Sequence, residues 1–110
     1  RMDIRSGRID WDLQGTPVLA DTVAHLPDRK ILLQSVDTAV RQQLTSRWEQ
    51  AIRGLPVGGS LIFRLTLPGD EHVMICERGL FFLPGTTGGF LVGYWLPASG
   101  PVSVIRPEDH

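Results

Sequence analysis

The sequence is poor in the residues that build disulfides and metal sites. Its 110 residues include a single cysteine, Cys76, and three histidines. One cysteine cannot form an internal disulfide, whereas small secreted domains usually carry several. No cysteine pair exists, and no two histidines have the three- or four-residue spacing common in zinc sites. The sequence therefore predicts no metal site and a cytoplasmic protein.

Charge of one sign and long apolar runs are also missing. The chain carries 11 Lys and Arg residues against 12 Asp and Glu residues, a formal net charge of -1. No basic cluster forms the positive stripe that binds nucleic acid or an anionic membrane surface. No apolar run approaches the roughly 20 residues of a membrane-spanning helix, and no signal segment opens the chain. We expect neither a nucleic-acid partner nor a membrane partner.

The remaining composition is that of one globular domain. Hydrophobic residues make up 42% and charged residues 21% of the chain, both ordinary values. This length can bury one core without disulfides. We expect a domain at residues 1–97 and a Pro-rich, polar linker at residues 98–110, leading to a downstream domain.

The clearest predicted element is a helix over residues 37–54. Its apolar residues recur with the helical period and form one stripe, consisting of Val36, Val40, Leu44, Trp48, Ala51, Ile52 and Leu55. Asp37 or Ser35 can cap its start, because their side-chain oxygens accept hydrogen bonds from free amides. Gly54 suits the left-handed position that follows a helix.

After this helix the apolar period changes to two, which is typical of strands. Strands are predicted at residues 61–67, 72–83 and 90–96, with short turns that imply an antiparallel meander. Residues 1–12 alternate around Ser6-Gly7 and predict a hairpin, and residues 21–26 predict a short helix. The order indicates an α+β, two-layer domain: a five-stranded antiparallel sheet with the long helix and short helices on one face.

A hairpin turn at Gly69-Asp70 would assign the side chains of the meander to two faces. Phe63 would then face Cys76, and Leu65 would face Met74, on the inner face beneath the helix. The candidate ligand-binding residues are Val40, Leu44, Trp48, Phe63, Leu65, Met74 and Cys76. They line either a filled core or a small apolar pocket.

The outer face would then be a candidate protein interface. Its residues are Ile62, Arg64, Thr66, Val73, Ile75 and Glu77. Glu77 is expected to pair with Arg64 on the adjacent strand. An apolar centre with a polar rim is typical of protein interfaces, so we expect a homodimer or a partner protein here.

Several stretches, in this order, resemble the pattern of PAS domains. Residues 2–11 (MDIRSGRIDW) look like the first hairpin of the family, and residues 35–40 (SVDTAV) resemble the entry into its long helix. Residues 63–70 (FRLTLPGD) resemble a strand and turn, while residues 77–79 (ERG) and 91–93 (LVG) resemble the last two strands.

Two positions depart from that pattern. Met74 stands where the family often has Trp, and Pro97 opens the segment where the family often has Asp-Ile-Thr. That terminal motif commonly joins the last strand to an output helix. We therefore expect a non-helical linker after the last strand.

The resemblance implies a non-catalytic regulatory module of a larger bacterial signalling protein. Such modules precede histidine kinases or enzymes of cyclic-di-GMP signalling, and they act through protein contacts, in some cases with a small apolar ligand. A haem-binding member needs an axial histidine on or near the long helix, where this chain has none. The reactive-cysteine motif of flavin-binding members is absent too, so we expect no cofactor.

Two alternatives stay open at this point. The chain can be a pure docking domain with a filled core that binds a partner enzyme. It can also be a small α+β enzyme in which a carboxylate of Asp37 or Glu77 works with His72. No nucleophile motif accompanies the second alternative.

Overall fold

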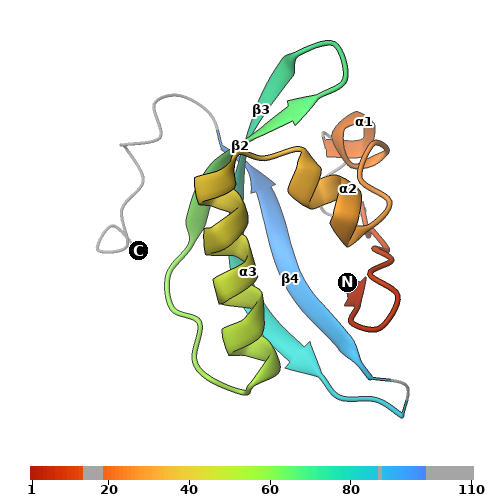
Figure 1. The fold of residues 1–110 in the computed structure, drawn as a ribbon, viewed down its shortest axis with the longest axis vertical. Coiled ribbons are helices and arrows are strands. Elements are labelled where there is room, and N and C mark those ends of the chain that lie inside the picture. Colours follow the sequence, from red (N-terminus) through yellow and green to blue (C-terminus); the bar gives the residue numbers. More distant parts are fainter. Residues whose placement is uncertain (14–18, 87, 99–110) are drawn as a thin grey trace.

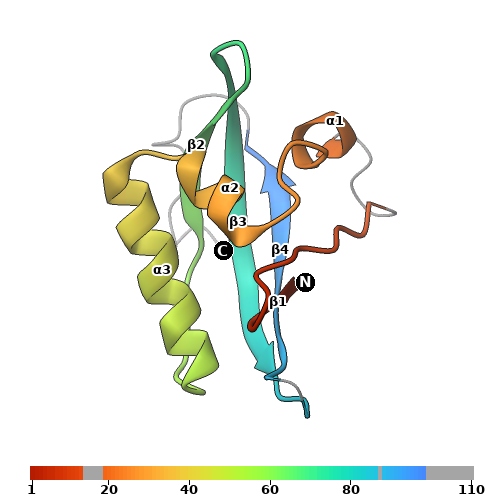
Figure 2. The same cartoon turned by 45° about the vertical axis from the view of Figure 1, so that its right-hand side comes forward.

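The chain folds into an antiparallel sheet and helices that share one core. The computed structural model describes residues 1–13, 19–86 and 88–98. The elements are β1 (Met2–Asp3), α1 (Ala20–Val23), α2 (Arg29–Gln34), α3 (Thr38–Ile52), β2 (Leu61–Leu67), β3 (Glu71–Leu83) and β4 (Phe90–Pro97). Helix α3 lies alongside β2 and β3, and the two short helices lie near the carboxyl end of β4 (Figures 1 and 2). The α+β class predicted from the sequence is confirmed.

The sheet has four strands in the order β1-β4-β3-β2, so the expectation of five strands is not confirmed. The second arm of the predicted N-terminal hairpin makes only isolated bridges, from Met2 to Ile9 and from Arg8 to Asp28. The cause lies in the bonding of this arm. The Ile9 amide donates to the carbonyl of Pro27, which draws the arm toward the start of α2.

Helix α3 agrees with the prediction from periodicity. Asp37 caps it by accepting a hydrogen bond from the Val40 amide at 2.8 Å. Gly54 has φ +75° just beyond its end, as expected for a left-handed terminal position. Leu44 of α3 is fully buried against the sheet, together with Leu65 and Ile75. No helix in the described ranges has both the length and the apolar character needed to cross a membrane.

The turn between β2 and β3 sets a register different from the predicted one. Phe63 pairs with Ile75, not with Cys76, and Leu67 pairs with Glu71. The connection therefore has three residues, 68–70, instead of two, and both Gly69 and Asp70 have positive φ. A shift of one residue moves every side chain of a strand to the opposite face. The residues of β3 that were predicted to face the core, Met74 and Cys76, therefore lie on the outer face, and those predicted to face outward lie on the inner face.

A β-bulge bends β3 where it passes β4. Arg78 pairs with Tyr94 and Phe81 with Val92, so two residues of β3 lie opposite one residue of β4. Gly79, in the bulge, has φ +68°, and a Cβ atom there would lie 2.7 Å from Cδ2 of Tyr94. Bulges increase the local twist of a sheet, which accounts for its curl here.

Gly79→Ala is expected to destabilise the protein by about 2–3 kcal/mol, because the left-handed φ and the Tyr94 contact both oppose a side chain. Gly59→Ala is the matched control, since Gly59 has φ +69° with nothing within 4 Å of its Cβ position. That control should lose only roughly 1–2 kcal/mol. Urea unfolding followed by circular dichroism measures both. Equal losses would contradict a role for Tyr94.

Candidate polar site in the core

One carboxylate lies buried where α3, β3 and β4 meet. Glu77 is only 2% exposed, and it is the one buried acidic or basic residue in the described ranges. It pairs across the sheet with Leu61 on β2 and with Trp95 on β4, so it lies on the face that α3 covers. A buried carboxylate is costly unless hydrogen bonds and an opposite charge satisfy it.

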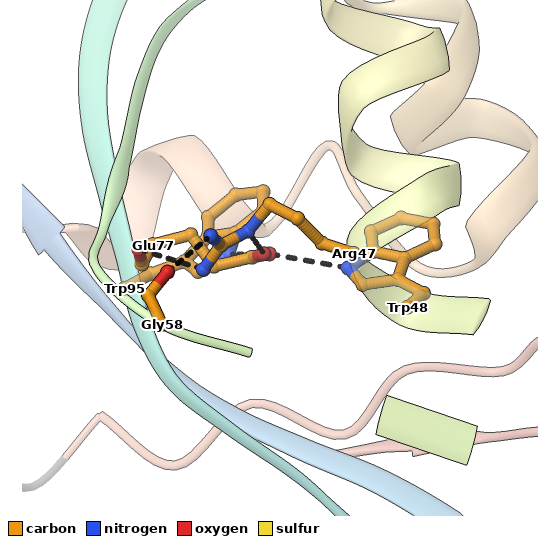
Figure 3. Close-up of polar contacts among 5 residues, drawn as sticks. All are labelled: Arg47, Trp48, Gly58, Glu77 and Trp95. Carbon is orange, nitrogen blue, oxygen red and sulfur yellow. Dashed lines mark hydrogen bonds and ion pairs between the residues drawn. The ribbon is translucent and has the colours of Figure 1, made fainter. Parts of the chain in front are cut away.

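Both carboxylate oxygens of Glu77 have donors (Figure 3). Oε1 accepts from Nε of Arg47 at 3.2 Å. Oε2 accepts from the indole N–H groups of Trp48, at 3.3 Å, and Trp95, at 3.0 Å. We call these four residues the Glu77 cluster. The cluster joins two residues of α3 to one residue each of β3 and β4.

Arg47 extends the cluster toward the segment before β2. Its guanidinium donates to the backbone carbonyls of Gly58 and Glu77, each at 3.5 Å. Its side chain is 14% exposed, so solvent reaches only a small part of it. Arg47 therefore neutralises Glu77 and also holds the loop that leads into β2.

Aromatic rings enclose the indole of Trp95. Its ring centroid lies 4.9 Å from that of Trp11 and 5.4 Å from that of Phe63, the second pair in an edge-to-face arrangement. Trp11 donates its own N–H to the carbonyl of Leu26 at 2.8 Å. These contacts orient Trp95 so that its N–H points at Glu77.

A small hollow of about 60 Å³ adjoins the cluster, with Trp48, Glu77 and Trp95 in its wall. The rest of its wall is mostly apolar, including Met2, Ile9, Trp11, Leu32, Leu80 and Leu91. In the described ranges no three His, Cys, Asp or Glu side chains gather as metal ligands would. The cluster binds protein donors with both carboxylate oxygens, an arrangement suited to joining elements of the fold.

No family model, curated protein or solved structure matches the chain.

The predicted ligand-binding residues separate into two groups. Leu44, Trp48, Phe63 and Leu65 are buried in the core, and Val40 packs against it. Met74 and Cys76 lie on the opposite face of the sheet, because the register differs by one residue from the predicted one. Ligand binding by the inner group stays a prediction.

The predicted interface residues separate in the same way. Ile62, Arg64 and Thr66 of β2 share the outer face with Cys76, Met74 and His72, respectively. Val73, Ile75 and Glu77 are instead on the inner face, so their assignment to an outer interface is wrong. The expected pair of Glu77 with Arg64 is also wrong, since Glu77 pairs with Arg47.

The structure does not assemble the carboxylate–histidine pair of the enzyme alternative. His72 is exposed and lies 3.3 Å from the hydroxyl of Thr66. Glu77 lies five residues further along the same strand on the other face, a separation of roughly 17 Å. Asp37 is occupied in capping α3.

The sequence contains a signal for the Glu77 cluster. Glu77 follows Val73 and Ile75 at the same two-residue spacing, so it lies on the same face of the strand. An acidic residue on a buried face needs a cation beside it. Arg47 stands beside the apolar stripe of α3, next to Trp48, which made it the available partner. The predicted register of β3 placed Glu77 on the outer face, away from Arg47.

Proposed function

We propose that this chain is a non-catalytic, PAS-like regulatory module of a larger bacterial signalling protein, acting through protein contacts. The resemblance of its motifs to PAS domains and the α+β architecture support the proposal. The observation that carries it is an exposed apolar surface on the outer face of the sheet. A domain without reacting groups acts by shifting the equilibrium of its neighbour, which requires such a contact surface.

The outer sheet face exposes large apolar side chains from β3 and β4. On the outer face, Phe81 pairs with Val92 and Leu83 pairs with Phe90. Leu91, between Phe90 and Val92 on β4, points to the other face and is buried. The exposed members are Phe81 at 43%, Leu83 at 48%, Tyr94 at 60% and Leu96 at 37%. Arg64, Thr66, His72 and Arg78 supply polar groups on the same face.

A second copy of the chain is the occupant that we propose for this face. Monomeric proteins rarely expose a large continuous apolar patch. In a dimer with twofold symmetry the same patch meets itself, so apolar residues contact apolar residues. The hollow beside Glu77, at about 60 Å³, is far below the roughly 300–1,000 Å³ of ordinary ligand pockets. This core hollow is therefore too small for an ordinary ligand.

Phe81→Glu is expected to convert a dimer to a monomer, because it places a charge at the centre of the apolar patch. Sedimentation velocity at micromolar concentration measures the mass of both proteins. Ile52→Glu is the matched control: Ile52 is 36% exposed on α3, away from this face, and its variant should remain dimeric. A monomeric parent, or a Phe81→Glu variant that still dimerises, would remove the proposed interface.

A further inference from the structure

Strand β2 forms one edge of the sheet, because the strand order β1-β4-β3-β2 gives it a single neighbouring strand. In Figure 2, β2 lies on the side of the sheet toward α3. Along an antiparallel strand, the backbone N–H and C=O groups of successive residues point alternately to its two sides. Every second residue of β2 therefore bonds to β3, and the residues between them present their backbone groups at the open edge.

Two hydrogen bonds show which residues of β2 face this edge. The Thr66 amide donates to the Ser35 carbonyl at 2.8 Å, so the backbone groups of Thr66 point away from β3. The Met74 carbonyl on β3 accepts from the amide that follows β4, so it points away from its partner on β2, Arg64. Such a pair does not exchange backbone hydrogen bonds, so Arg64 also faces the edge. Ile62 has the same phase.

One position on this edge is already occupied by another backbone, and two are open. The Ser35 carbonyl takes the Thr66 amide. In the ranges that the structure describes, no hydrogen bond reaches the backbone N–H or C=O of Ile62 or Arg64 from the side of the edge. An extended backbone is the occupant that supplies donors and acceptors to both residues at once.

A shallow groove of about 520 Å³ lies beside the same edge. Leu61, the residue before Ile62, borders it on β2, and one face of α3 forms the other wall, with Ala39, Gln42, Gln43, Ser46 and Arg47. Their spacing of three or four residues places these side chains on one side of the helix. They are small or uncharged except Arg47, whose charge Glu77 already neutralises. The groove therefore suits small or polar uncharged side chains.

Arg64 gives the edge a positive charge without a counterion. Its side chain is exposed on the outer face, where its neighbours are Ile62, Thr66 and Met74. In the described part of the chain, no carboxylate forms an ion pair with it. A strand added at this edge would place one side chain directly beside Arg64, where opposite charges attract and like charges repel. This position favours an acidic residue, and pairing of two β2 strands about Arg64 would bring two cations together.

We propose that the open edge of β2 binds an extended segment of a partner protein as an additional strand. The segment has an acidic side chain beside Arg64 on the outer face and small or polar uncharged side chains toward the groove along α3. About five residues, at roughly 3.3 Å each, are enough to span Leu61 to Leu65. This site goes beyond the proposed dimer, which uses the apolar surface of β3 and β4, and it does not rest on that dimer.

A synthetic peptide tests the edge directly. The probe is acetyl-Thr-Val-Thr-Glu-Thr-Val-Thr-amide, in which the Glu and both Val side chains share one face of the strand and the Thr side chains share the other. At millimolar concentration it should slow the exchange of the Ile62 and Arg64 amide hydrogens about tenfold, because a ladder protects them. The Phe63 and Leu65 amides bond to β3 with or without the peptide and serve as internal controls. Unchanged exchange of Ile62 and Arg64 would overturn the proposal.

Reversing the charges tests the role of Arg64. Arg64→Glu should abolish the response to this peptide and create a response to the same peptide with Lys in place of Glu. Arg5→Glu is the matched control, because Arg5 is exposed beside Gly88 at the opposite edge of the sheet. That variant should still respond to the Glu peptide. Equal responses of the parent protein to the Glu and Lys peptides would contradict the charge pairing.

Two further measurements separate this site from contacts between copies of the chain. Phe81→Glu, which separates the proposed dimer, should respond to the Glu peptide as the parent does. The two proposals can therefore fail independently. Protection of the Ile62 and Arg64 amides that rises with protein concentration in the absence of peptide would assign the edge to a second copy and contradict the proposed partner.

Discussion

Glu77→Ala should destabilise the protein by about 3–5 kcal/mol, because it leaves a poorly solvated guanidinium and two indole N–H groups without their acceptor. Arg47, Trp48 and Trp95 all donate to this one carboxylate. Urea unfolding monitored by circular dichroism gives the change in the free energy of unfolding. Glu71→Ala is the matched control, because Glu71 is exposed on the same strand and its loss should be nearly neutral.

A double-mutant cycle separates the charge pair from the rest of the cluster. Replacing one partner of a buried ion pair leaves the other charge buried and unpaired. Replacing both partners with apolar residues leaves no buried charge that needs a partner. Arg47→Leu combined with Glu77→Leu should therefore lose less stability than the sum of the two single variants. Additive losses would show that Arg47 and Glu77 do not interact in solution.

Trp48→Ala should cost about 3–5 kcal/mol, the usual range for removing a large aromatic side chain from a core. Trp48 is buried in the same cluster of side chains as Leu44, Phe63 and Ile75. Ile52→Ala, on the exposed end of the same helix, should change the free energy of unfolding far less. Wild-type-like unfolding of Trp48→Ala would show that this ring does not support the core.

Trp48→Phe divides that loss into its two parts. Phenylalanine retains most of the apolar ring but has no N–H group for Oε2 of Glu77. Its loss should be about 1–2 kcal/mol, the cost of leaving one acceptor with fewer donors. Trp95 continues to donate to the same oxygen, at 3.0 Å, which limits the effect. A loss as large as that of Trp48→Ala would mean that the hydrogen bond outweighs the packing.

Local features of this fold could be predicted from the sequence. The α3 helix follows from an apolar stripe, a capping Asp37 and a terminal Gly54, all of which act within a few residues of one another. The strands of the meander follow from an apolar period of two. These signals survive without knowledge of the tertiary structure because the hydrogen bonds of a helix and the alternation of a strand are local.

The candidate site depended on relationships that the sequence leaves open. One extra residue in the turn at 68–70 exchanged the faces of β3, which brought Glu77 inside and moved Met74 and Cys76 outside. The exposed apolar surface of β3 and β4 then depended on the bulge at Gly79, which shifts the alternation of β3 once more.

The sequence by itself determined the α+β class, the long helix and the approximate extents of the strands, because each rests on short-range periodicity. The antiparallel meander of β2, β3 and β4 was also predicted correctly. Only the tertiary structure decided the register of these strands, the place of β1 beside β4, and which donors reach Glu77. A carboxylate on β3 meets Arg47 only after some thirty residues of chain have folded back, since a contact at that separation depends on every turn between. The number of strands also depended on tertiary contacts, because the arm at Arg8 and Ile9 bonded to the segment before α2 instead of extending the sheet.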